Sequence, residues 1–120
     1  HVAQVDRPPL KCLVQVSLDV TDEPGRAGVR PELAMALAEQ IARAANLELA
    51  GVMGVAPRGG DARAAFELLA GVGAGIADNH DSATVISAGM SGDFAAAIAA
   101  GATHVRLGSA LLGERAGFVR

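Results

Sequence analysis

Short β-branched apolar runs alternate along this chain with longer segments whose apolar residues repeat at helical spacing. The runs lie at 13–18, 47–55, 84–86 and 104–107. This pattern predicts four β-strands, each followed by a helical or turn segment. Strands separated by helices pair in parallel through right-handed crossovers, and strands that are apolar throughout are covered on both faces. The sequence therefore predicts an α/β fold, either half of a (β/α)8 barrel or a small open sheet.

Three helices are expected between these runs, over residues 31–45, 61–69 and 93–100. Apolar side chains recur every four residues along the first of them, at Leu33, Leu37 and Ile41. Such spacing gives a helix one apolar face.

Residues that favour helix ends stand at the expected boundaries. Asn46 is a suitable stop for the first helix, Asp61 can cap the second, and Gly101 ends the third. The glycine-rich stretch 71–81 is predicted to be a loop.

Composition excludes several classes of protein. The chain has 120 residues, enough for one modest domain, and a formal net charge of −3. That charge does not suggest a nucleic-acid surface, and no apolar run approaches the roughly 18 residues that span a bilayer. The single cysteine, Cys12, cannot form an internal disulfide, which agrees with a cytoplasmic protein.

The loop after the third strand is the first candidate site. Residues 87–93 hold two hydroxyls, at Ser87 and Ser91, and two glycines directly before a helix. Backbone N–H groups at a helix start, together with hydroxyls, suit a phosphate group. The alternative is an ordinary turn in which Ser91 caps the helix.

The fourth strand supplies the second candidate. Alternation places His104, Arg106 and Gly108 on one face and Val105 and Leu107 on the other. We expect the apolar pair to face the helices, so that Arg106 points into a barrel at its upper rim. A buried guanidinium needs an anion or another acceptor. A structural ion pair is the alternative.

Four other features carry less weight. The glycines at 71–75 follow a helix rather than a strand, which is the wrong context for a nucleotide loop. Residues 80–82, His-Asp-Ser, are neighbours in sequence and cannot converge as a catalytic triad does, so a solvated loop is expected. The three histidines and one cysteine show no metal-ligand spacing. Cys12 borders a strand and is expected in the core.

Taken together, these segments resemble the pyridoxal 5′-phosphate (PLP) homeostasis family, which is related to the alanine racemase N-terminal domain. The resemblance runs through most of residues 10–115. It is strongest in the stretches 87–93, Ser-Ala-Gly-Met-Ser-Gly-Asp, and 101–113, which contains Arg-Leu-Gly-Ser. The stretches 12–18, 25–28 and 49–54 are similar to the fifth strand, the loop after it and the sixth strand of that family.

The resemblance implies a PLP-binding (β/α)8 barrel of fold type III, with residues 1–120 forming its C-terminal half, strands five to eight. It implies a cofactor carrier in PLP and amino-acid homeostasis rather than an assigned enzyme. The intact protein is then a cytoplasmic monomer that binds neither nucleic acid nor membrane. The implied cofactor-binding residues are Ser87, Gly89, Met90, Ser91, Arg106, Gly108 and Ser109.

Within that set the resemblance assigns the phosphate to Ser91 and the pair Gly108 and Ser109. It assigns the pyridine nitrogen to Arg106, whose charge keeps that nitrogen unprotonated and weakens the ring as an electron sink. The lysine that forms the Schiff base belongs to the first strand, in the N-terminal half. Lys11 is the only lysine here, at the wrong end of a strand for that role.

Two other functions remain open on the sequence. An amino-acid racemase dependent on PLP would need a second base, commonly a tyrosine, and this chain has no tyrosine. A small α/β module that binds a phosphate-bearing ligand without PLP would need only the loops.

Overall fold

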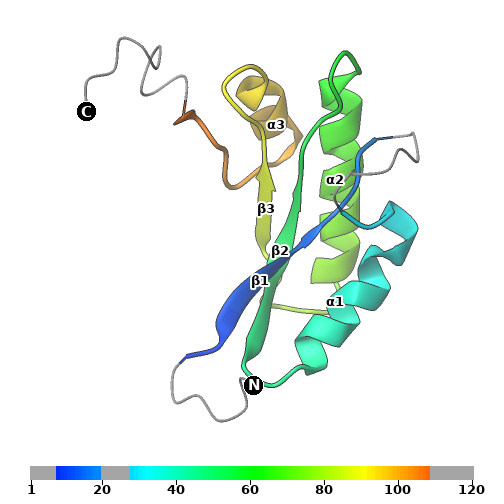
Figure 1. The fold of residues 1–120 in the computed structure, drawn as a ribbon, viewed down its shortest axis with the longest axis vertical. Coiled ribbons are helices and arrows are strands. Elements are labelled where there is room, and N and C mark those ends of the chain that lie inside the picture. Colours follow the sequence, from blue (N-terminus) through cyan, green and yellow to red (C-terminus); the bar gives the residue numbers. More distant parts are fainter. Residues whose placement is uncertain (1–7, 20–27, 109–120) are drawn as a thin grey trace.

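The computed structural model describes residues 8–19 and 28–108, which form a parallel sheet packed against helices (Figure 1). The strands are β1 (Leu10–Gln15), β2 (Leu47–Gly54) and β3 (Val85–Ala88). They lie in the order β1-β2-β3, and both pairings are parallel. The predicted α/β class and parallel pairing are confirmed.

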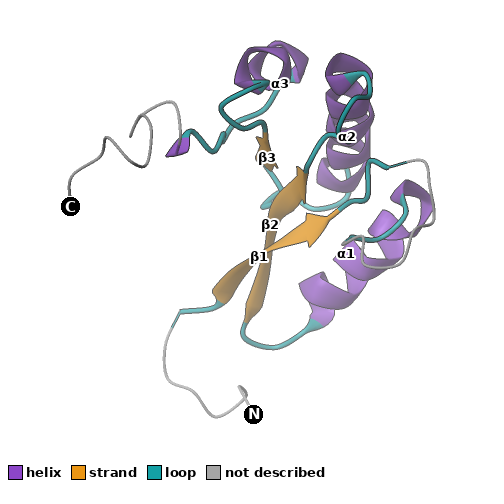
Figure 2. Ribbon diagram, turned by 45° about the horizontal axis from the view of Figure 1, so that its top comes forward, coloured by secondary structure: helices purple, strands orange, loops and turns teal. Residues whose placement is uncertain are grey.

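The helices lie in one layer against the sheet (Figure 2). A 3-10 turn, η2 (Pro31–Leu33), leads into α1 (Ala34–Arg43), while α2 (Ala62–Ala77) follows β2 and α3 (Phe94–Ala100) follows β3. Because the spatial order of the strands follows the chain, right-handed crossovers bring each helix to the same face. A doubly wound sheet reverses its strand order and carries helices on both faces. Neighbouring strands of a (β/α)8 barrel have this same order, with their helices on one face.

The core between these layers is aliphatic apart from one ring. Phe66 and Leu69 of α2 are 2% and 0% exposed, and they lie in one cluster with Val14 and Val52 of the sheet. Gly73 brings α2 close to the strands, since a Cβ there would lie 3.1 Å from Cγ2 of Val52. Burial of apolar area at this interface is the main stabilising contribution, at about 25 cal/mol per Å².

Local boundary signals are confirmed for two of the three helices. The first helix ends at Arg43, earlier than the predicted stop, and Asn46 lies in the turn before β2 with a φ of 69°. The Asp61 carboxylate accepts the N–H of Ala64 at 3.2 Å, which caps α2. Gly101 follows α3 with a φ of 115°.

Two helix predictions are wrong. The stretch expected as a loop over 71–81 is helical as far as Ala77, because packing of Gly73 against β2 and β3 outweighs the low helix propensity of glycine. Leu33 is 54% exposed, although the spacing placed it on the buried face. It belongs to η2, and the buried face of α1 starts at Ala34.

Two strand predictions need correction as well. The first strand spans Leu10–Gln15 rather than 13–18, and Val16 makes only an isolated bridge to Val29. The predicted strand 104–107 is reduced to one bridge between His104 and Ser87. The described residues thus hold three strands rather than four, although the segment 103–106 still makes backbone hydrogen bonds to Ile86, Ala88 and Gly89.

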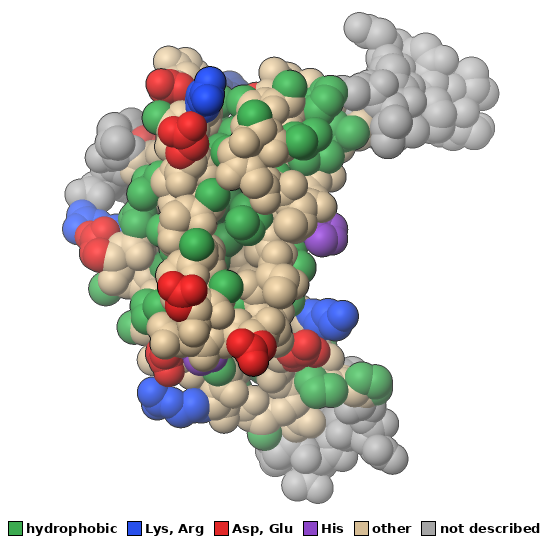
Figure 3. Space-filling model, turned by 180° about the vertical axis from the view of Figure 1, so that it is seen from behind, with side chains coloured by type: hydrophobic (Ala, Val, Ile, Leu, Met, Phe, Trp, Pro, Cys, Tyr) green, Lys and Arg blue, Asp and Glu red, His purple; other side chains and the backbone are tan. Residues whose placement is uncertain are grey.

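Acidic and basic side chains of the described residues are interspersed, with apolar ones between them, on the face in Figure 3. In the described part of the chain, none of the helices has both the length and the apolar character required to cross a bilayer.

Candidate functional site

The first candidate segment, 87–93, begins inside β3 and leaves the sheet at Gly89. Ser87 and Ala88 complete the strand, with Ala88 in the core and Ser87 half-buried. Gly89 has a φ of 98°, and a Cβ on it would lie 2.7 Å from Cβ of Ala97 in α3. This glycine is therefore required by the turn and by the close approach of α3.

A closed turn follows Gly89. The N–H of Met90 donates to the Asp93 carboxylate at 2.8 Å, and the N–H of Asp93 donates to the Met90 carbonyl at 3.1 Å. The residue that precedes α3 is Asp93, so the alternative in which Ser91 caps the helix is wrong. Ser91 is half-buried and the side chain of Met90 is exposed.

The second candidate segment runs beside the first. The N–H of Ala88 donates to the His104 carbonyl and the N–H of Arg106 donates to the Gly89 carbonyl, both at 2.9 Å. The two motifs, fifteen or more residues apart in the sequence, therefore meet at the C-terminal end of β3. Ligands bind at this end of the strands in parallel α/β proteins.

Side chains of the second segment alternate as expected. A Cβ on Gly89 would lie 3.4 Å from Cγ1 of Val105, which places Val105 on the side of α3. Val105 and Leu107 are half-buried, whereas His104 and Arg106 are exposed. Within 8–19 and 28–108, the guanidinium of Arg106 has no acid within ion-pairing distance.

The groups around the meeting point suit an anion. Neither Gly92 nor Gly108 would bring a Cβ within 4 Å of any atom, so open space borders the backbone at both positions. The N–H of Gly92 finds no acceptor among the described residues. An unpaired guanidinium, a free N–H and two uncovered glycines leave room and donors for a phosphate ester. Ser109, also predicted to bind the cofactor, lies outside the described residues.

One contributor was missed by reasoning from the sequence. Thr103 Oγ1 accepts the N–H of Ile86 at 2.8 Å and donates to the Ile86 carbonyl at 3.2 Å. This side chain fastens the second segment to β3 just below the meeting point. A threonine just before a predicted strand is a weak signal, and its partner is seventeen positions away.

Features set aside on the sequence lie away from this site. Lys11 is near the start of β1, hence at the opposite end of the parallel sheet. Cys12 is a free, half-buried thiol in the same strand. The described residues contain no group of three or more His, Cys, Asp or Glu side chains that could hold a metal ion.

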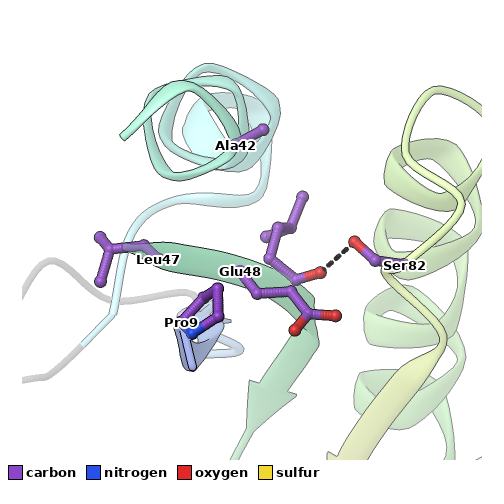
Figure 4. Close-up of a pocket in the computed structure, with 6 residues that line it drawn as sticks. Pro9, Ala42, Leu47, Glu48 and Ser82 are labelled. Carbon is purple, nitrogen blue, oxygen red and sulfur yellow. Dashed lines mark hydrogen bonds between the residues drawn. The ribbon is translucent and has the colours of Figure 1, made fainter. Parts of the chain in front are cut away.

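The stretch 80–82 is a loop in which Asp81 and Ser82 are exposed, as predicted, whereas His80 is half-buried. The side chain of His80 is 17% exposed, and its Nε2 lies 3.2 Å from Oε2 of Glu39 in α1. Ser82 Oγ donates to the Leu49 carbonyl (Figure 4). These residues connect the end of α2 to the start of β3, and the side chains of His80 and Ser82 form hydrogen bonds with protein groups there.

A hollow of about 260 Å³ lies at the same end (Figure 4). Its lining residues surround the start of β2 and comprise Pro9, Ala42, Leu47, Glu48, Leu49 and Ser82. This hollow is at the end of the strands opposite to the predicted cofactor residues.

Residues 1–116 match the family described as alanine racemase, N-terminal domain. The chain belongs to this family. Its fold is accordingly a (β/α)8-barrel-like α/β fold, of which the described residues form a small parallel sheet with helices on one face.

Curated relatives of the chain include proteins named pyridoxal phosphate homeostasis protein. The pyridoxal phosphate homeostasis protein of Vibrio cholerae is 40% identical over 114 residues, which are 92% of this chain and 48% of the relative. The protein of that name from Mycobacterium leprae is 40% identical over 88% of this chain and 41% of the relative. The chain spans about half the length of these relatives.

Solved structures of similar fold agree. A protein of unknown function from Bifidobacterium adolescentis has a TM-score of 0.75 at 28% identity, over 83% of this chain and 42% of its own. PipY of Synechococcus elongatus, solved with PLP bound, has a TM-score of 0.66 at 28% identity, over 83% of this chain and 47% of its own.

Proposed function

We propose that this chain is the C-terminal half of a PLP-carrying barrel and supplies the phosphate and pyridine side of the cofactor site. The observation that carries the proposal is the meeting of the loop after β3 with the segment 104–106, where the N–H of Arg106 donates to the Gly89 carbonyl. The PLP-bound relative PipY and the names of the curated relatives support the same cofactor.

Each part of the site has a separate task. Ser91 and the N–H of Gly92 bind the phosphate, together with Gly108 and Ser109 of the second segment. Ser87, Gly89 and Met90 line the site beneath that phosphate. The Gly89 carbonyl already accepts the Arg106 N–H, and the Met90 N–H already donates to the Asp93 carboxylate. These two backbone groups are therefore not counted as phosphate ligands.

Arg106 binds on the pyridine side. Its guanidinium donates to the ring nitrogen and keeps a proton off it. When bound, PLP supplies an aldehyde that condenses with amines and a ring that accepts electrons. An unprotonated ring nitrogen favours retention and release of the cofactor over carbanion chemistry.

The role that follows is PLP homeostasis without assigned turnover, in a monomeric cytoplasmic protein. Half the length of the relatives is absent from this chain, and that other half supplies the first four strands and the Schiff-base lysine. Strands β1, β2 and β3 are then the fifth to seventh of the barrel, and 104–107 is the eighth.

Absorbance and borohydride reduction of the full-length protein test this function. We expect an imine band between about 320 and 450 nm, and a reduced adduct on one lysine outside residues 1–120. An adduct on Lys11, or no imine band with saturating PLP, would overturn the proposal. Arg106→Gln should weaken PLP binding at least tenfold, whereas Arg43→Gln, an exposed arginine at the opposite end of the sheet, should leave it unchanged.

A further inference from the structure

Four side chains form a row across the sheet just below the proposed site. Register pairs Gln15 with Met53, Met53 with Ser87, and Ser87 with His104. Side chains at paired positions of parallel strands point to the same face. The preceding pairs, Val14 with Val52 and Val52 with Ile86, bring the core valines to the helical face. The row containing His104 therefore faces away from the helices, as Arg106 does two residues later.

The imidazole of His104 is anchored on one nitrogen. Its Nδ1 lies 2.8 Å from Thr103 Oγ1, which already receives the N–H of Ile86. The Ile86 carbonyl also accepts the backbone N–H groups of Thr103 and His104, at 2.8 Å and 3.1 Å. The contact of Nδ1 with Thr103 Oγ1 orients the imidazole beside β3.

Few other charges face this imidazole. Gln15, Met53 and Ser87 across the sheet are uncharged, and α3 has no ionisable side chain. Arg106 carries a fixed positive charge on the same face. The carboxylate of Asp93, on the loop above, is engaged by the N–H of Met90.

We propose that His104 is a further binding residue of this site, and that its protonation strengthens the hold on the anionic cofactor. The inference rests on the proposed function. Histidine is the side chain whose charge changes between about pH 5 and 8, and an added cation within roughly 10 Å of a phosphate ester raises affinity by about three- to tenfold.

The test measures binding of pyridoxine 5′-phosphate to the full-length protein at pH 6 and pH 8. This alcohol analogue of PLP forms no imine, so the lysine contributes no pH dependence. We expect the ratio of affinities at the two pH values to be about three- to tenfold larger in the wild type than in His104→Asn. His104→Gln is the second variant, because its amide also keeps a polar group on this exposed position.

His80→Asn is the matched control, since His80 lies at the other end of the sheet against Glu39. It should retain the wild-type ratio. An unchanged ratio in both His104 variants overturns this inference and leaves the proposed function intact. Failure of the wild type to bind the analogue at either pH, together with the absence of an imine band, overturns the proposed function and this inference with it.

Discussion

Replacing Gly89 by alanine tests the physical account of the turn that forms the site. A φ of 98° costs an L-residue about 1–2 kcal/mol. The added methyl group would stand 2.7 Å from Cβ of Ala97, which cannot rotate away, and such overpacking costs about 1–3 kcal/mol. We expect Gly89→Ala to lower the free energy of unfolding by about 2–5 kcal/mol.

Urea unfolding of the full-length protein, followed by far-UV circular dichroism, measures this loss. At about 2 kcal/mol per molar urea, the midpoint falls by roughly 1–2.5 M. Gly92→Ala is the matched control, three positions along the same loop, with no atom within 4 Å of a Cβ and no positive φ. It should cost less than about 1 kcal/mol. Equal losses in the two variants would refute the reasoning.

Two further predictions concern elements that position the site. Gly51→Ala would place a Cβ 1.9 Å from the Val85 carbonyl oxygen, with only backbone nearby, so the pairing of β2 with β3 should be lost, and with it cooperative unfolding by circular dichroism. Soluble, cooperatively folding Gly51→Ala protein would contradict this account. Asp61→Ala removes the cap that accepts the Ala64 N–H and should lower stability by about 1 kcal/mol in urea titrations, with Asp61→Asn close to wild type.

Features that depend on a few neighbouring residues were predictable from the sequence. Asp61 and Gly101 act on backbone within a turn of themselves, and they start and end a helix as expected. The meeting of the two motifs was predictable too, because the C-terminal ends of parallel strands share one edge of a sheet.

Features that depend on distant contacts were not. The helix continues through 71–77 because Gly73 packs against Val52 and Ile86. The helix propensities of the residues in this stretch do not predict that contact. The hydrogen bonds between the Thr103 side chain and the Ile86 backbone join residues that only the tertiary structure brings together. The closed turn of Met90 and Asp93 occupies donors that loop composition alone suggested for a ligand.

The outer margins of the sheet have a practical consequence for anyone who expresses this segment alone. Beyond β1 on one side and 103–107 on the other, the described residues supply no further strand, and Leu10 and Leu13 are 47% and 37% exposed on β1. Strands at an uncovered edge of a sheet can form backbone hydrogen bonds with strands of other chains, which leads to aggregation. A polypeptide restricted to these residues should therefore self-associate as its concentration rises. Light scattering across a dilution series, compared with that of the full-length protein, would measure how much covering these strand edges reduces self-association.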